Sequence, residues 1–418
     1  MVLGIVGACL VLTLSRSFGI NEGIWTLGGA SLLVLAGALP PSEAARTIYD
    51  LLGVGIFLAG LFWLSLAAER AGLIEILGNK VVDCSGGDGR LLLVAVVLLA
   101  SATTAMFSND GTVVLVTPVV IQLCQRMRVD PLPYAFAVTF VTDTASSIVP
   151  VANPVNVLFA ERLDLTFGSH IVYLAVPTLA ALAVTTIMLI VVMSDRIPRR
   201  INRMGAERAE SGILDGPARL VGACLLMTAI GYVIAAVAGI SPFWITLAGG
   251  AIALLPGLIA GRVRLPDVVR VQPPGLYAFV AGLAVIVATV DRQGLLDSVS
   301  RLVLSLQNQP GLVRILGIGF GAAVGSNLIN NWTMALVLIP PLDAGNAPDA
   351  LIFAGLFGTD IGPNLTIVGS LATLIWMTQV RRAGLVVTTW TYLRLGLLTT
   401  VPALFVAMLA LVLMGRIV

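Results

Sequence analysis

Three aspartates lie within long apolar stretches of the chain: Asp110, Asp143 and Asp360. A carboxylate inside a membrane segment is energetically costly unless it faces a polar cavity, so these positions indicate a function. Because burial favours the neutral carboxyl group over the carboxylate, such a side chain can bind and release a proton near neutral pH. The residue types therefore predict proton transfer, with Asp110 as the first candidate and Asp143 and Asp360 as alternatives.

Amide side chains and helix breakers accompany these aspartates. Pro150, Pro154, Gly362 and Pro363 interrupt two apolar segments, and each break frees backbone groups that only a protein-lined, wet cavity can satisfy. A polar pocket is one interpretation, and hydrogen bonding between helices is the alternative for any single Asn, Ser or Thr. The residues predicted to bind a ligand in this pocket are Asn109, Asp110, Thr112, Asn153, Asn327, Asn330, Asn331 and Asn364.

The composition defines the class of protein that must position these residues. Of the 418 residues, 58% are apolar and 11% charged, and the mean hydropathy is +1.01. These values predict an all-α integral membrane protein with many crossings. A net charge of +2 argues against nucleic-acid binding, and four cysteines are too few for a disulfide scaffold. Lys80 lies outside any Walker A loop, so we expect no nucleotide site of that kind and no cofactor.

Because a crossing needs about 20 apolar residues, the hydropathy pattern predicts ten crossings. Two further apolar segments, 90–125 and 311–343, carry polar clusters near their middles and are predicted to be re-entrant helical hairpins. Two of the crossings, 132–156 and 350–379, are predicted to be broken near the midplane. The crossings are expected at residues 1–14, 24–39, 47–68, 132–156, 168–194, 218–238, 242–260, 275–291, 350–379 and 385–415.

The same pattern divides the chain into two halves, 1–194 and 218–418, that start on opposite sides of the membrane. Most of the 24 basic residues fall on one side, which predicts that the Arg-rich loop 195–217 is cytoplasmic and both termini are outside. In sequence, Asn109 and Asp110 align with Asn330 and Asn331, Thr112 with Thr333, and Asp143 with Asp360. Inverted repeats with broken helices are typical of secondary transporters.

Two other kinds of site fit the sequence less well. An intramembrane aspartyl protease needs a second glycine in the segment Gly358 to Asp360, which has none. A thiolate metal site is disfavoured because Cys9, Cys84, Cys124 and Cys224 lie in unrelated segments. His170, the single histidine, is predicted to be an interfacial residue near the end of its crossing. We therefore expect a carrier rather than an enzyme, with no metal site.

Several segments resemble bacterial arsenite and antimonite efflux permeases of the ion transporter superfamily. They include FSNDGTVVLVTPVV (107–120), GSNLINNWTMALVLIP (325–340) and TDIGPNLTIVGSLATLIWM (359–377), and the resemblance covers nearly the whole chain. The last segment is the most specific, with GPNL and GSLATLIW nearly as the family has them. The segments SIVPVANP (147–154) and WTM (332–334) depart from the usual family pattern, which bears on the details of the pocket.

The resemblance implies proton-coupled efflux of arsenite and antimonite across the bacterial inner membrane, in some systems with an accessory cytoplasmic ATPase. Arsenite is mainly an uncharged trihydroxide, which amide and hydroxyl groups could bind through all three hydroxyls. A sodium- or proton-coupled carrier of another small solute remains the alternative. A carboxylate substrate would favour a basic group near the two hairpin tips, where the chain has no Arg or Lys.

Overall fold

The computed structural model describes most of the chain as helices. Among the described residues no strand occurs, and six helices are long and apolar enough to cross a membrane by length and composition. The all-helical membrane class is thereby confirmed. Most of the predicted loop 195–217 lies outside the described residues, which are 2–15, 22–201, 216–238, 242–294, 296–307, 309–344, 347–367 and 369–417.

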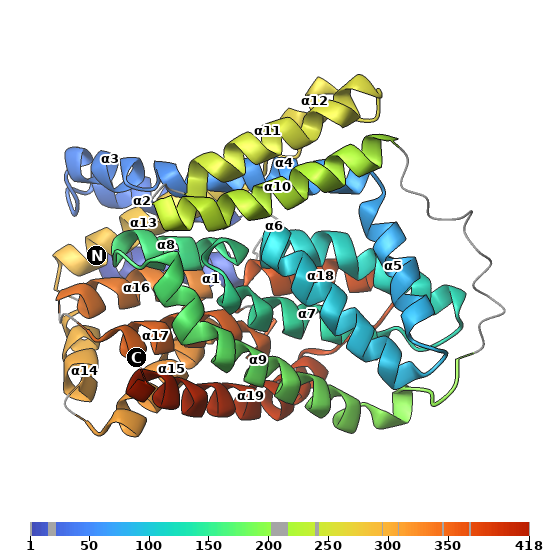
Figure 1. Ribbon diagram of the computed structural model, residues 1–418. Coiled ribbons are helices and arrows are strands. Elements are labelled where there is room, and N and C mark those ends of the chain that lie inside the picture. Colours follow the sequence, from blue (N-terminus) through green and yellow to red (C-terminus); the bar gives the residue numbers. More distant parts are fainter. Residues whose placement is uncertain are drawn as a thin grey trace.

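The helices occur in the same order in the first and second halves of the chain (Figure 1), with the single element α6 corresponding to the pair α15 and α16. The first series is α1 (Val2–Ser15), α2 (Glu22–Leu35), α3 (Pro41–Tyr49), α4 (Leu52–Arg70), α5 (Leu73–Cys84), α6 (Gly89–Arg126), α7 (Leu132–Ala145), α8 (Pro154–Arg162) and α9 (Phe167–Val192). The second is α10 (Gly216–Ala238), α11 (Pro242–Ile259), α12 (Leu265–Arg270), α13 (Pro274–Arg292), α14 (Asp297–Gln307), α15 (Gly311–Ile329), α16 (Asn331–Ala344), α17 (Asp349–Ile361), α18 (Leu371–Arg382) and α19 (Thr389–Ile417).

The corresponding short helices of the two series lie on opposite sides of the view in Figure 1. In Figure 1, α3 lies at the left and its counterpart α12 toward the right, whereas α5 lies at the right and its counterpart α14 at the left. This is the arrangement expected of an inverted repeat. Two ion pairs follow the same symmetry: Arg70, which ends α4, pairs with Asp267 of α12 at 3.8 Å, and Arg292, which ends α13, pairs with Glu43 of α3.

Long helices of each half pack against helices of the other half. Helix α4 packs on α11, and α13 packs on α2, so each half completes the other. The contact points correspond: Gly60 is the ninth residue of α4 and Gly282 the ninth of α13. A Cβ on Gly60 would lie 2.5 Å from the backbone of Thr246, and one on Gly282 would lie 2.5 Å from that of Thr26. Glycine at these two positions lets the helix backbones meet.

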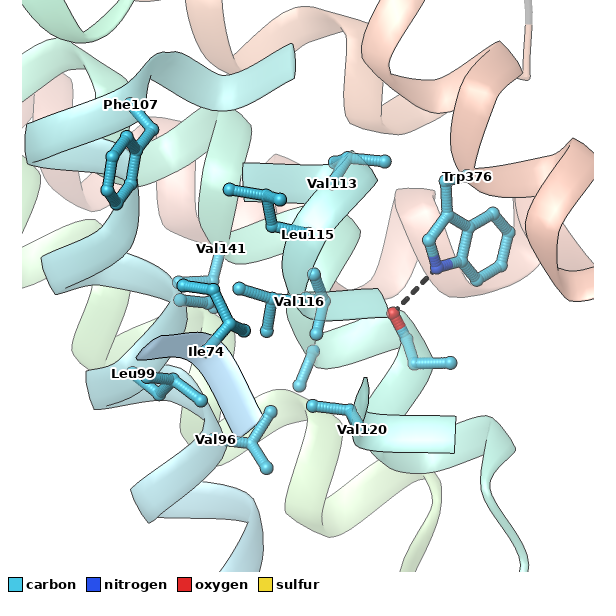
Figure 2. Packing of buried hydrophobic residues seen from close by; sticks show 14 of the residues in the cluster. Ile74, Val96, Leu99, Phe107, Val113, Leu115, Val116, Val120, Val141 and Trp376 are labelled. Atoms are coloured by element: carbon cyan, nitrogen blue, oxygen red, sulfur yellow. Dashed lines mark hydrogen bonds between the residues drawn. The ribbon is translucent and has the colours of Figure 1, made fainter. Parts of the chain in front are cut away.

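Helix α6 is a hairpin and not one straight rod. Its backbone leaves the helical region at Ser108 (φ 68°, ψ 169°), and the Thr104 hydroxyl donates to the Thr112 hydroxyl at 3.2 Å. In a continuous helix, residues eight apart would be separated by about 12 Å. In Figure 2, Val96 and Val120 lie near one end of the hairpin and Phe107 lies at the other. Asn330 (φ 73°, ψ 151°) makes the equivalent turn between α15 and α16.

Both predicted broken crossings are interrupted in the structure. Between α7 and α8 the chain forms two short 3-10 turns, Ser146–Ile148 and Pro150–Ala152. Between α17 and α18 it forms the turn Gly362–Leu365. The second parts, α8 and α18, then begin with side-chain N-caps, Asn153 and Ser370, which satisfy backbone N–H groups exposed by the break.

Four short helices, α3, α5, α12 and α14, were not predicted. Helices α3, α5 and α14 each have one apolar and one polar face, and α12 is only six residues long, so none has the continuous apolar run on which the span prediction relied. Consequently α4 begins at Leu52, whereas the predicted crossing began at residue 47 within α3. Helix α8 likewise extends to Arg162, beyond the predicted end of the broken crossing at residue 156.

We predict that Gly60→Val lowers the stability of the protein by about 1–3 kcal/mol, because the added side chain must displace the α11 backbone. The measurement is the thermal unfolding midpoint of the purified protein in detergent. Gly55→Val is the matched control, since a Cβ at Gly55 on the same helix meets nothing within 4 Å. Equal midpoints for the two variants would contradict the close contact between α4 and α11.

Candidate functional site

Two aspartates are buried inside the protein, one on the first part of each broken helix. Asp143 of α7 is 0% exposed and Asp360 of α17 is 1% exposed. The neighbouring aromatic rings hold α7 in place: Phe136 packs on Trp376 of α18 with ring centroids 4.9 Å apart. The Trp376 indole N–H also donates to the Ala135 carbonyl at 2.8 Å (Figure 2). The second part of one broken helix thus fixes the first part of the other.

Asp360 receives hydrogen bonds from the first repeat. The Ser147 hydroxyl donates to Oδ2 at 2.8 Å, and the Asn153 amide donates to Oδ1 at 2.8 Å. Asn153 is also the N-cap of α8, where its Oδ1 accepts from the Val155 N–H at 3.0 Å. One amide side chain therefore caps a helix and binds a carboxylate. The two donors thus give each oxygen of this buried carboxyl group a hydrogen-bond partner.

Asp143 is contacted from the hairpin of its own repeat and from the opposite repeat. The Asn109 amide donates to Oδ1 of Asp143 at 3.1 Å, and Ser370, the N-cap of α18, lies beside the same carboxyl group. The arrangement is crossed, because the N-cap of each broken helix faces the aspartate of the other one. We call Asp143, Asp360, Asn153 and Ser370 the crossed centre.

Asp110 lies at the hairpin tip, next to the crossed centre. Its side chain is partly exposed, and its carboxyl group has no hydrogen bond or ion pair to any described residue. Asp143 lies within electrostatic range of both Asp110 and Asp360. The four segments that meet here, 99–121, 132–160, 318–342 and 350–380, contain no lysine or arginine. The site is therefore anionic or protonated, with no basic side chain from these segments to neutralise it.

Three of the residues predicted to bind a ligand make hydrogen bonds within the protein. Thr112 accepts a hydrogen bond from Thr104 across the hairpin. Asn327 donates to the carbonyls of Ala323 and Gly362, each at 2.7 Å, and so ties the second hairpin to the second broken helix. The Asn364 amide donates to the Phe140 carbonyl at 3.0 Å, and its Oδ1 accepts no hydrogen bond from any described residue.

The predicted alignment of the two hairpin tips is shifted by one residue. Ser108 and Asn330 have the same left-handed backbone conformation. The Oδ1 atom of the next residue then accepts from the N–H that follows it, Asn109 from Asp110 and Asn331 from Trp332. The structural counterpart of Asn109 is therefore Asn331, and that of Asp110 is Trp332. The sequence alignment paired Asn109 with Asn330, whereas the backbone turn pairs it with Asn331.

Other residues at the centre were underestimated or misread from the sequence. The prediction that His170 is interfacial was wrong, since its side chain is fully buried beside the break in the first broken helix. Ser147, which binds Asp360, and Asn156, which donates to the Ser146 carbonyl at 2.9 Å, are not among the residues predicted to bind a ligand. The available signal was their position close to the helix breakers Pro150 and Pro154.

Three buried oxygens near the crossed centre accept no hydrogen bond from any described residue. They are Oδ2 of Asp143, Oδ1 of Asn156 and Oδ1 of Asn364. Buried acceptors normally have donors, so these atoms suit a ligand that carries several N–H or O–H groups. Among the described residues no group of His, Cys, Asp and Glu side chains could hold a metal ion.

A cavity of about 1040 Å³ reaches the first helix break from the end of the molecule where α3 meets α4. Its lining includes Pro150 and Val151 at the break, and it extends between α4, α8, α10 and α11. Near its outer part, Arg162 at the end of α8 forms an ion pair with Asp50 at 3.6 Å. The cavity thus lies between the first broken helix, which carries part of the site, and the helices α4, α10 and α11, which pack around it.

Comparisons with known proteins place the chain among membrane transporters. An arsenical pump membrane protein of Escherichia coli is 27% identical to the chain over 98% of both sequences, and that of Yersinia enterocolitica is 27% identical over 98% of both. The YdaH transporter of Alcanivorax borkumensis has the same fold, with a TM-score of 0.63, 15% identity, and coverage of 89% of this chain and 87% of that one.

A second solved structure, the efflux pump MtrF of Neisseria gonorrhoeae, matches with a TM-score of 0.61 and 12% identity over 100% of this chain and 94% of that one. At such identities the two structures show the fold alone. The family evidence comes from sequence, because the model of the family described as "Arsenical pump membrane protein" matches residues 2–414. The chain therefore belongs to the arsenical pump membrane protein family, and it is a multi-pass membrane transporter.

Proposed function

We propose that this transporter exports arsenite and antimonite from the bacterial cytoplasm across the inner membrane in exchange for protons. The observation that carries the proposal is the crossed centre, where buried carboxyl and amide groups meet without a basic side chain from the surrounding segments. A basic residue would be expected if the substrate were an organic anion. Amides and carboxyl groups suit a neutral substrate and a proton.

Arsenite fits the hydrogen-bonding capacity of the site. Mainly an uncharged trihydroxide at neutral pH, it offers three O–H donors, and the site has three buried acceptors without a donor, on Asp143, Asn156 and Asn364. No cysteine belongs to the four segments that meet at the site. Thiols bind trivalent arsenic strongly and would slow its release, so a carrier that turns over benefits from hydroxyl and amide groups.

Proton coupling provides the driving force that a neutral substrate lacks. Each proton that enters gains about 2.3 kcal/mol per 100 mV of membrane potential, which corresponds to more than a tenfold substrate gradient. Asp110 is the proposed proton carrier, because it is partly exposed and has no partner among the described residues. Asp143 and Asp360 lie behind it, and neighbouring carboxyl groups titrate as a coupled set.

The proposed transport cycle moves one set of helices against another. The mobile unit comprises the two hairpins and the two broken helices, and the scaffold comprises the exchanged helices α2, α4, α11 and α13. The cavity between α4 and α8 separates part of the mobile unit from the scaffold. The ion pair between Asp50 and Arg162 bridges the same boundary. Alternating access would require this boundary to open and close.

We predict that everted membrane vesicles containing the protein accumulate arsenite when a proton gradient is imposed. A protonophore should abolish the accumulation, because the substrate itself carries no charge. Vesicles from cells without the protein are the control. If energised vesicles accumulate neither arsenite nor antimonite, the proposed substrate is wrong, and the same vesicles should be tested with sodium gradients and other small solutes.

We predict that Asp110→Asn lowers proton-driven arsenite uptake by at least about tenfold, because an amide cannot carry the proton. Asp110→Glu retains a carboxyl group and should recover part of the activity. The matched control is Thr103→Val, which changes the same hairpin at a side chain that donates to the Leu99 carbonyl within its own helix and should leave uptake within about twofold of the unmodified protein. Normal proton-driven uptake by Asp110→Asn would mean that Asp143 or Asp360 carries the proton and Asp110 does not.

A further inference from the structure

His170 is buried against the first helix break. Its side chain is 0% exposed, and its Nε2 atom lies 2.9 Å from the Ser147 carbonyl oxygen. The ring also packs edge-on against Phe353 of α17, with centroids 5.6 Å apart. The chain contains no other histidine. No step of the proposed transport cycle uses this buried polar ring beside the helix break.

The geometry determines the hydrogen-bonding role of each ring nitrogen. A carbonyl oxygen can only accept, so Nε2 must carry the proton that it donates to Ser147. In the neutral ring Nδ1 then bears no proton, and it has no partner among the described residues. The Ser147 carbonyl is one of the groups freed by the end of α7, so His170 satisfies an acceptor that the helix break exposes.

The same residue that His170 holds also binds Asp360. The Ser147 carbonyl accepts from His170, while the Ser147 hydroxyl donates to Oδ2 of Asp360 at 2.8 Å. The preceding residue is held as well, because the Ser146 carbonyl accepts from the Asn156 amide. Asn156 and His170 thus hold the carbonyl groups of Ser146 and Ser147. With both peptide groups held, the Ser147 hydroxyl keeps its direction toward Asp360.

The second repeat has a polar ring at the equivalent position. His170 is the fourth residue of α9, and Tyr392 is the fourth residue of α19. The helix starts correspond, since Thr166 accepts from the Ser169 N–H and Thr388 accepts from the Thr391 N–H. Tyr392 is fully buried and packs on Phe136 of α7, as His170 packs on Phe353 of α17. The fold therefore places a polar ring beside the first part of each broken helix.

We propose that His170 is a positioning residue, which donates from Nε2 to the Ser147 carbonyl and so holds the Ser147 hydroxyl on Asp360. It acts through Ser147 and contacts neither substrate nor proton. It is not required to change its protonation state during transport. The transport tests below rest on the proposed function, and the spectroscopic test does not.

Two substitutions of opposite character separate the possible roles of His170. His170→Gln keeps an N–H donor near the position of Nε2 but loses the ring and cannot titrate, whereas His170→Phe keeps a ring against Phe353 but has no donor. We expect His170→Gln to retain arsenite uptake within about twofold of the unmodified protein, and His170→Phe to lower it about tenfold per folded molecule. Tyr173→Phe, one turn along α9, keeps its ring stacked on Phe353 and is the control with unchanged uptake.

Other outcomes would overturn the proposal. Better uptake by His170→Phe than by His170→Gln would mean that the ring matters only for packing. Loss of uptake in both variants at normal protein levels would mean that the ring must titrate or contact the substrate. Ser147→Ala should lower arsenite uptake about as much as His170→Phe does. The double variant should take up arsenite as well as the less active single variant, because both changes break the same chain of contacts. Multiplied defects in the double variant would show that the two residues act independently.

The tautomer can be measured without any transport. Because the chain has one histidine, imidazole-labelled protein purified without a histidine tag gives a single set of ring nitrogen signals in NMR. We expect a neutral ring with the proton on Nε2, unchanged from about pH 6 to about pH 8. A proton on Nδ1, or a ring that titrates in this range, would refute the positioning role even if arsenite is not the substrate.

Discussion

The structure depends on how two broken helices satisfy the polar groups that their breaks expose. Breaking a helix in an apolar environment leaves carbonyl and N–H groups that must find partners within the protein. Here the partners are crossed between the repeats: Asn153 caps α8 and binds Asp360, while Ser370 caps α18 and lies beside Asp143. Each half therefore completes the centre of the other, and the aspartates cannot be placed correctly by one half alone.

The same exchange extends through the scaffold. Helix α4 lies on α11 and α13 on α2, at glycines that occupy equivalent places, Gly60 and Gly282. The segments FLAGL (57–61) and FVAGL (279–283) carry this relationship in the sequence. The polar clusters at the hairpin tips revealed the duplication first, because carboxyl and amide groups in an apolar segment are rare, whereas glycines and leucines are common there.

Sequence reasoning identified the segments of the site better than the roles of single residues. Asn109, Asn153 and the three aspartates do lie together, because helix breakers and buried polar groups follow general rules of membrane proteins. Thr112 and Asn327 make hydrogen bonds between helical segments, since a hydroxyl or amide can serve a helix contact as readily as a ligand. His170 was misread because its distance from Asp360 along the chain conceals their proximity in space.

The sequence by itself determined the class of protein, the two-fold plan, the hairpins and the breaks, because these follow from local hydropathy and from residues that cannot continue a helix. Only the tertiary structure decided which partners each polar group has. The register of the hairpin tips came from the backbone at Ser108 and Asn330, and the link from His170 through Ser147 to Asp360 joins residues from three helical segments. Hydrogen bonds require distances and directions, and these exist only once both repeats have packed together.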